Sequence, residues 1–402
     1  MRRALWLLAF AGCVETDLAG VDRAVVVHLV DIDDQGTGHY EVAEHQLPEL
    51  ADMATLAGTR VAFVGSPTLD FGDDLDADSV LCPPRVGVTP SALDLRAAVE
   101  NGVAIPRDER SLAMLSAYHE LTLVLARAEE VTGITAEQFR DGPIPVNFEP
   151  TFVLGDARDD GKTNAFYDNC TDSFGLLRPS SVEAIRLAYD AQVLAHELGH
   201  AYFERTFRAA DGECDPGAPG FPGRFATDDT IAGMNEGFAD FFAFVLVGAL
   251  APLNDPLGIN EFSGERAIAP TVPNYEAFTG LAPDCSQEFY CIGTELVRSL
   301  YDAFVADGND PHDPAARAAL GRDVLAALPQ LPAAMRGYAD LPLPEPGLDQ
   351  RACKRIEDGG SVPQFLRALL EHLPAARRPS LCTAMTHHFA ERFATAGQGV
   401  CP

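Results

Sequence analysis

The sequence predicts an α+β protein in which a β-rich N-terminal part precedes a mostly helical C-terminal part. Two early apolar runs, residues 24–32 and 59–65, have the length and composition of buried strands. From residue 110 onward, apolar side chains recur at helical spacing instead. With 402 residues, 47% of them hydrophobic, the chain is long enough to bury a core and to form about two or three domains.

Residues 23–105 form a partly β region to which the sequence assigns no role. A long amphipathic helix is expected over 110–132, because leucines recur among polar residues and Gly133 is a suitable C-cap. Residues 144–155 are expected to form one or two strands, and residues 163–169 a short extended segment. The stretch 172–179, "DSFGLLRP", has the composition of a turn.

Three further helices are predicted in the second half of the chain. Asp190 is a suitable N-cap for a helix over 191–207, which carries "HELGH". A helix over 234–250 is apolar on all sides and should be buried, and another is expected over 292–308. His119, on the helix over 110–132, is expected to pack in the core.

The first thirteen residues, "MRRALWLLAFAGC", resemble the signal peptide of a bacterial lipoprotein. Arg2 and Arg3 precede an apolar run that is too short to cross a bilayer as a helix. The resemblance implies a signal peptide over 1–12, a lipid anchor at Cys13 and a tether over 13–22. The expected location is the outer membrane or cell surface, and the alternative is an ordinary secretory signal with a secreted or periplasmic product.

Composition limits the other partners. The chain carries 29 basic and 60 acidic residues, a net charge of −31. Nucleic acid is not an expected partner, because phosphate binding needs a basic surface. Eight cysteines besides Cys13 predict disulfides in an exported protein, with Cys285 and Cys291 close enough in sequence for a local bridge.

The "HELGH" helix has the residues of a metal site. Residues four apart on a helix share a face, so His196 and His200 can bind one zinc ion together. Glu197, beside His196, can act as general base toward a water molecule on that ion. Two histidines need a third protein ligand to make a catalytic zinc site.

The stretch "NEGFAD", residues 235–240, supplies a candidate for that ligand. Glu236 lies near the start of the apolar helix, where a buried carboxylate is costly unless it is paired or binds a metal. Asp240, one turn later, can accept a hydrogen bond from a ring N–H of His196 or His200 and so orient it. The alternative is a helix N-terminus that simply favours acidic residues.

Together, "HELGH" and "NEGFAD" resemble the HExxH and NExxxD motifs of gluzincin metallopeptidases, especially the thermolysin-like and fungalysin-like groups. "NAFYD", residues 164–168, is similar to the edge strand on which these peptidases bind the substrate backbone. The resemblance implies a thermolysin-like zincin fold, with a β-rich upper lobe over 106–209 and a helical lower lobe over 210–402. It also implies that Asn164 and Ala165 contact the substrate.

The chain departs from the thermolysin-like pattern at the position that stabilises the oxyanion. Those enzymes have a histidine just before the helix that follows the third ligand, where it stabilises the oxyanion of the transition state, and no histidine lies just before residue 292 here. Tyr290 is the candidate replacement, because a phenol can donate a hydrogen bond to an oxyanion. The alternative is a tyrosine that only packs.

The expected function is therefore that of a zinc-dependent peptidase, most simply a monomeric endopeptidase that acts on peptides or proteins and contacts the membrane only through Cys13. The alternative functions are an inactive gluzincin-like lipoprotein that binds zinc and peptide, and a periplasmic binding or assembly module. One zinc ion is expected. Calcium near Asp156, Asp159 and Asp160 is a further option that no motif supports.

Overall fold

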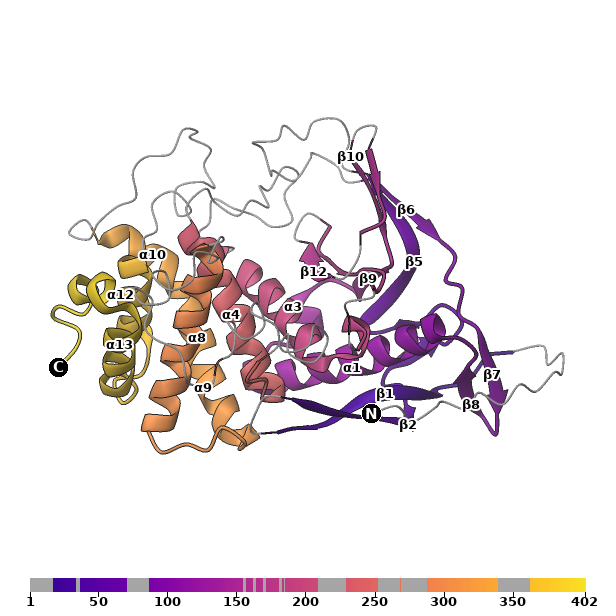
Figure 1. Ribbon diagram of the computed structural model, residues 1–402, viewed down its shortest axis with the longest axis horizontal. Helices are drawn as coiled ribbons and strands as arrows, with labels where there is room; N and C mark the ends of the chain where they lie inside the picture. Colours follow the sequence, from indigo (N-terminus) through magenta and orange to yellow (C-terminus); the bar gives the residue numbers. More distant parts are fainter. Residues whose placement is uncertain are drawn as a thin grey trace.

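The computed structural model describes residues 17–33, 37–70, 87–154, 157–161, 164–168, 171–180, 183, 185–208, 229–251, 268, 288–338 and 362–402. The predicted signal peptide and Cys13, together with Cys285 and Asp156, lie outside these ranges. Within them the α+β class is confirmed. Figure 1 shows the strands gathered at one end of the molecule and helices α8 to α13 at the other.

The smaller sheet is built from the N-terminal strands. Its order is β2 (Gly38–Gln46), β1 (Arg23–Ile32), β8 (Val103–Pro106) and β7 (Ala97–Glu100). β1 is antiparallel to β2 and parallel to β8. The prediction of a strand over 24–32 is confirmed, whereas β2 was not predicted because its sequence, "GHYEVAEHQ", has no apolar run.

The larger sheet carries strands from both sides of the predicted boundary at residue 105. Its order is β11 (Ala157–Asp159), β10 (Thr151–Leu154), β5 (Val61–Asp70), β9 (Ile144–Phe148), β13 (Ser173–Leu176) and β12 (Ala165–Asp168). Off this order, β4 (Ala57–Gly58) and β6 (Gly87–Ser91) pair with β5, and β3 (Leu50–Asp52) pairs with β4. β5 is parallel to both β9 and β10. Residues 61–70 are therefore an internal strand, and their removal would divide this sheet.

The prediction of a turn over 172–179 is wrong for its first half, which forms β13. β13 lies between β9 and β12, and all four of its residues are buried. Gly175, which suggested the turn, is needed for packing. A Cβ atom there would lie 2.1 Å from the ring of Phe166 on β12, so only glycine admits that ring.

The helices form the rest of the described structure. They are α1 (Glu109–Thr132), α2 (Ala136–Phe139), α3 (Ala191–Phe203), α4 (Asp229–Val247), α8 (Glu288–Ala306), α9 (Pro314–Ala327), α10 (Leu331–Gly337), α12 (Val362–His372) and α13 (Arg378–Ala396). Two short 3₁₀ helices, η1 (Leu187–Tyr189) and η4 (Leu328–Gln330), and a π-helical segment, η2 (Glu204–Arg208), accompany them. None of the helices in the described ranges is long and apolar enough to span a membrane.

Helix α1 lies between the two sheets (Figure 1), and its C-cap at Gly133 is the one that the sequence predicts. Asp108 caps its first turn by accepting a hydrogen bond from the Ser111 amide, and Gly133 closes it with a positive φ of 70°. Its Ser116 hydroxyl accepts a hydrogen bond from the Val27 amide of β1, which fixes the smaller sheet on the helix. The larger sheet and α3 pack against other parts of the same helix.

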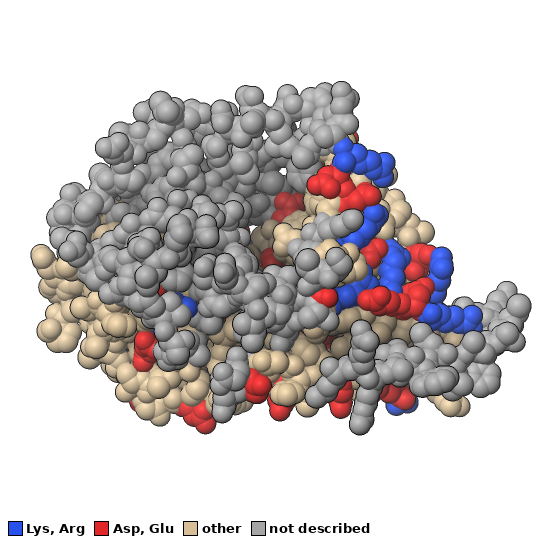
Figure 2. Space-filling view, viewed as in Figure 1, with Lys and Arg blue, Asp and Glu red and all other residues tan. Residues whose placement is uncertain are grey.

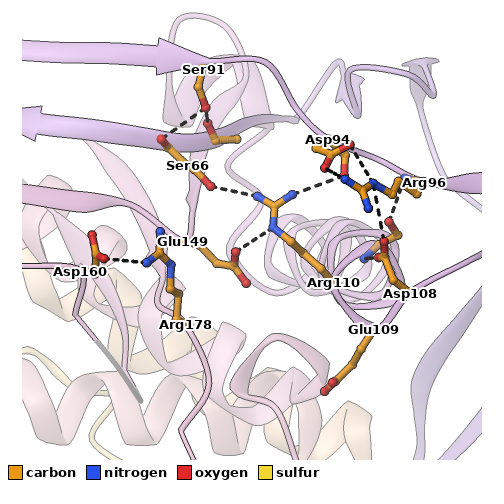
Figure 3. A network of polar contacts seen from close by, with 12 residues as sticks. Ser66, Ser91, Asp94, Arg96, Asp108, Glu109, Arg110, Glu149, Asp160 and Arg178 are labelled. Atoms are coloured by element: carbon orange, nitrogen blue, oxygen red, sulfur yellow. Dashed lines mark hydrogen bonds and ion pairs between the residues drawn. The ribbon is translucent and has the colours of Figure 1, made fainter.

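A buried ion-pair network joins α1 to the strands and to the segment before α3, and Figure 3 shows its pair between Arg110 and Glu149. Glu149, between β9 and β10, pairs with Arg110 of α1 at 2.7 Å and with Arg186 at 2.9 Å. Both guanidinium groups also lie over the Phe148 ring, 5.4 and 5.9 Å from its centroid. The Glu149 carboxylate thus connects the β9–β10 turn with α1 and with the segment before α3.

Replacing Glu149 with glutamine is expected to lower the free energy of unfolding by about 3 kcal/mol, because two guanidinium groups lose their shared carboxylate. The side chains of Glu149 and Arg186 are only 10% and 8% exposed, so water cannot compensate for the lost charge. Asp160→Asn is the matched control, since its pair with Arg178 is far more exposed and contributes at most about 1 kcal/mol. Urea unfolding measures both losses, and equal losses would contradict this account.

A second buried network joins α8 to α13. His388 Nδ1 lies 2.6 Å from Glu295 Oε2, and its Nε2 lies 2.8 Å from Asp302 Oδ2. Burial disfavours the imidazolium, but the hydrogen bonds to Asp302 and Glu295 outweigh it and raise the pKa of His388 above its ordinary 6.5. Arg298, also buried, is paired with Glu295 at 3.3 Å.

The raised pKa predicts a pH-dependent contribution to stability. Because the folded state holds this proton more tightly than the unfolded state, His388 stabilises the fold fully below about pH 6.5, and the contribution declines as pH rises through the folded pKa. The difference in unfolding free energy between wild type and His388→Gln should therefore be larger at pH 5.5 than at pH 8.5. His387→Gln, at an exposed position beside it, should show no such trend.

One disulfide lies among the described residues at the C-terminal end of the chain. Cys382 of α13 forms a disulfide with Cys401, which ties the chain end to that helix and agrees with the prediction of disulfides. Cys291 lies in α8, and its predicted partner Cys285 is outside the described residues.

In Figure 2, basic and acidic side chains are interspersed over the β-rich end of the molecule, and acidic side chains lie along the lower edge of the view.

Candidate metal centre

The helix that carries "HELGH" begins where the sequence predicts. The Asp190 side chain caps α3 by accepting a hydrogen bond from the Gln192 amide at 2.8 Å. The same carboxylate accepts a second hydrogen bond from the Tyr40 hydroxyl of β2 at 2.9 Å. All residues of α3 are buried, so its histidines face neighbouring elements rather than bulk water.

Helices α3, α4 and α8 approach one another closely at two contacts where a glycine leaves room. A Cβ atom on Gly199 would lie 2.6 Å from the Ala239 Cα atom of α4. A Cβ atom on Gly237 would lie 2.4 Å from the Gly293 carbonyl oxygen of α8. The glycines inside "HELGH" and "NEGFAD" are therefore what allows these helices to approach and the two motifs to meet.

The hydrogen-bond partners of the histidines fix their protonation. His196 Nδ1 lies 2.8 Å from Asp240 Oδ1, and His200 Nδ1 lies 3.0 Å from Asn235 Oδ1. The Asn235 amide is oriented by Glu204, which accepts from its Nδ2 at 3.1 Å. Carboxylate and amide oxygens only accept, so both Nδ1 atoms donate, and a neutral ring with its proton on Nδ1 has its lone pair on Nε2.

Both lone pairs converge on one carboxylate. The two Nε2 atoms lie 3.0 Å apart, and Glu236 oxygens lie 3.5 Å from His196 Nε2 and 3.8 Å from His200 Nε2. Atoms bound tetrahedrally to one zinc ion at about 2.1 Å are roughly 3.4 Å apart. Three acceptors this close and less than 10% exposed repel one another unless a cation lies among them, so these residues fit zinc.

Glu197 is held by the edge strand. Its Oε2 atom accepts a hydrogen bond from the Tyr167 backbone amide of β12 at 2.8 Å. The side chain is 6% exposed and adjoins both histidines, with ligand-type atoms of His196, Glu197 and His200 all within 4.8 Å of one another. The strand amide thus fixes the direction of the carboxylate that would accept a proton.

The prediction of a strand at 163–169 is confirmed by β12, which ends the sheet and pairs with β13 alone in the strand order. Asn164 turns its carbonyl toward β13, where it accepts from the Leu177 amide at 2.9 Å. Because alternate residues of a strand face opposite sides, the backbone groups of Ala165 point the other way, as the Tyr167 amide does. Substrate contact at Asn164 and Ala165 stays a prediction.

One boundary near the site differs from expectation. The helix predicted to begin at residue 292 begins at Glu288, so Tyr290 lies inside the first turn of α8 and not in a preceding loop. Its side chain lies outside the described part of the structure. The carboxylates Asp159 and Asp160, named for calcium, accept hydrogen bonds from Gly161 and Thr151.

Sequence reasoning missed three contributors to the site. The Tyr167 amide orients Glu197, Asn235 orients His200, and Glu204 orients Asn235. Asn235 and Glu204 could have been suspected, because each is a polar residue within a predicted helix next to the motif residues. Nothing in the sequence indicates that the Tyr167 amide, rather than a neighbouring one, reaches Glu197.

Comparison with known proteins finds a likeness among solved structures. No protein-family model and no curated protein matches the chain. Among solved structures, the chain is similar to the precursor of protealysin, a metalloproteinase from Serratia proteamaculans, with 13% identity and a TM-score of 0.44 over 88% of this chain and 92% of that chain. At this identity and TM-score the likeness carries no argument about activity, which must come from the geometry of the site.

Proposed function

We propose that the protein is a zinc-dependent peptidase of the gluzincin type that cleaves internal bonds of peptides or proteins. The observation that supports this most strongly is the convergence of two Nε2 lone pairs and the Glu236 carboxylate within 3.0 to 3.8 Å. Zinc held there would polarise the scissile carbonyl and lower the pKa of a water molecule. One ion per site and a peptide substrate follow from this proposal.

The residues around that point have complementary roles. Glu197 accepts the proton of the attacking water and passes it to the leaving amine, while the Tyr167 amide holds its carboxylate in place. Asp240 and Asn235 keep His196 and His200 in the tautomer that binds metal. An extended peptide would add to the outer edge of β12 through the backbone of Ala165, with Asn164 at its start.

Tyr290 is proposed as the oxyanion donor. Support comes from the contact between α8 and the third ligand, since a Cβ atom on Gly293 would lie 3.2 Å from Glu236 Cβ. Tyr290 precedes Gly293 by three residues in the first turn of α8. Export with a lipid anchor at Cys13 remains the proposed location.

The second candidate function is a zinc-binding and peptide-binding lipoprotein without activity, because the histidine expected before α8 is absent.

One experiment decides between the two functions. Hydrolysis of an unstructured protein substrate is measured with the zinc-loaded protein, then after 1,10-phenanthroline has removed the metal, and again after Zn²⁺ has been returned. Activity that is lost and then restored supports the peptidase. A protein that holds zinc and never hydrolyses the substrate favours the second function.

A further inference from the structure

Three imidazole rings meet where the β1–β2 hairpin packs on α1, away from the "HELGH" helix. The His28 ring of β1 lies 4.1 Å from the His45 ring of β2, and the latter lies 4.7 Å from the His119 ring of α1. His119 is 3% exposed, as expected for a core residue, and its Nδ1 lies 3.2 Å from Glu120. Core packing explains His119 but does not explain why two more histidines point to it.

The hairpin also brings a carboxylate to these rings. Glu41 is directly opposite His28 in the β1–β2 ladder, and their Oε1 and Nε2 atoms lie 3.0 Å apart. His45 lies on the same face of β2 as Glu41, with only the small Ala43 between them on that face. One ligand-type atom from each of His28, Glu41 and His45 lies within 4.8 Å of the other two.

An unsatisfied buried atom gives an independent reason to look for a ligand here. His45 Nε2 is buried and has no hydrogen-bond partner among the described residues. Buried ring nitrogens almost always have a partner, because leaving one unpaired costs about 1–3 kcal/mol. A metal ion bound by the neighbouring His28 and Glu41 would lie close enough to supply that partner.

We propose that His28, Glu41 and His45 form a second metal site, which binds a divalent transition-metal ion such as Zn²⁺ and fastens the β1–β2 hairpin. Two imidazoles and one carboxylate are a donor set that zinc prefers. Bound atoms would lie roughly 3.4 Å apart, so the separation of at most 4.8 Å closes by side-chain rotation. The Glu41 side chain is 59% exposed, which leaves room for water as a fourth ligand.

The site is tested by counting metal ions in untagged, non-reduced full-length protein that has been equilibrated with Zn²⁺ and desalted. Mass spectrometry of the metal should give two zinc ions per chain for wild type and one for Glu41→Gln. His39→Gln is the matched control, because His39 lies on the same strand and is 59% exposed, and it should keep two ions. Glu41→Gln should also keep peptidase activity.

A competition titration provides a second readout. Glu41→Gln and His45→Gln should each weaken one of two Zn²⁺ binding events by more than about 100-fold, beyond the effect of losing a group that only orients a ligand. One ion per chain in wild type, or two in both variants, would overturn the proposal. If wild type binds two ions but hydrolyses no peptide, the result would support this second metal site and contradict only the proposed peptidase activity.

Discussion

Glu197→Gln is expected to reduce kcat for peptide hydrolysis by about 10²–10⁴-fold while leaving the zinc content unchanged. The amide cannot accept the proton of the attacking water. Its oxygen can still accept the hydrogen bond that Tyr167 donates to Oε2, so the edge strand and α3 should remain in place. The loss should therefore appear in the rate of hydrolysis and not in the free energy of unfolding.

Two controls make this result specific. Glu130→Gln changes a glutamate that is 66% exposed on α1 and should leave kcat, zinc content and stability as in wild type. Metal analysis of Glu197→Gln separates loss of the base from loss of the ion. Hydrolysis by Glu197→Gln at the wild-type rate would show that another group takes the proton, and loss of zinc would show that Glu197 is a ligand.

The parts of the site that follow local rules could be predicted from the sequence. The N-cap at Asp190, the i, i+4 spacing of the histidines and the edge strand at β12 all depend on residues close in the chain. β13 was not predicted, because glycine is common in turns. Nothing in the sequence shows that Gly175 instead lies in a strand and leaves room for the Phe166 ring. The start of α8 was missed because "SQEFYC" contains no strong helix-start signal.

The contacts that orient the site depend on tertiary packing instead. Asp240 was predicted to bind either histidine, and only the approach of α4 to α3 at Gly199 selects His196. The order of partners from His200 through Asn235 to Glu204 spans two helices and a turn. The β1–β2 cluster likewise depends on register, since Glu41 meets His28 only because the hairpin pairs them.

Glu236→Gln is expected to weaken Zn²⁺ binding by far more than Asp240→Asn does. Loss of a group that orients a ligand typically costs about 10–100-fold in affinity, and Glu236 is proposed as a ligand itself. Peptide hydrolysis should fall as a smaller fraction of the protein holds zinc. Excess Zn²⁺ should restore hydrolysis by Asp240→Asn more fully than hydrolysis by Glu236→Gln. Competition against a chromophoric chelator measures the affinities, with Asp323→Asn on α9 as a control of equal charge change.

Glu236→Gln should lower the stability of the zinc-loaded protein and should not lower that of the metal-free protein. In the zinc-loaded state, wild type gains the binding free energy, about 2.7 kcal/mol when free Zn²⁺ is 100 times its Kd, and Glu236→Gln gains less. In excess chelator, wild type keeps a buried carboxylate 3.5 and 3.8 Å from two nitrogen lone pairs, a repulsion that the neutral amide relieves by donating a hydrogen bond. Glu236→Gln should therefore unfold at lower urea than wild type with zinc and at equal or higher urea without it. A variant that is less stable by the same amount in both states would mean that Glu236 supports the fold independently of any ion.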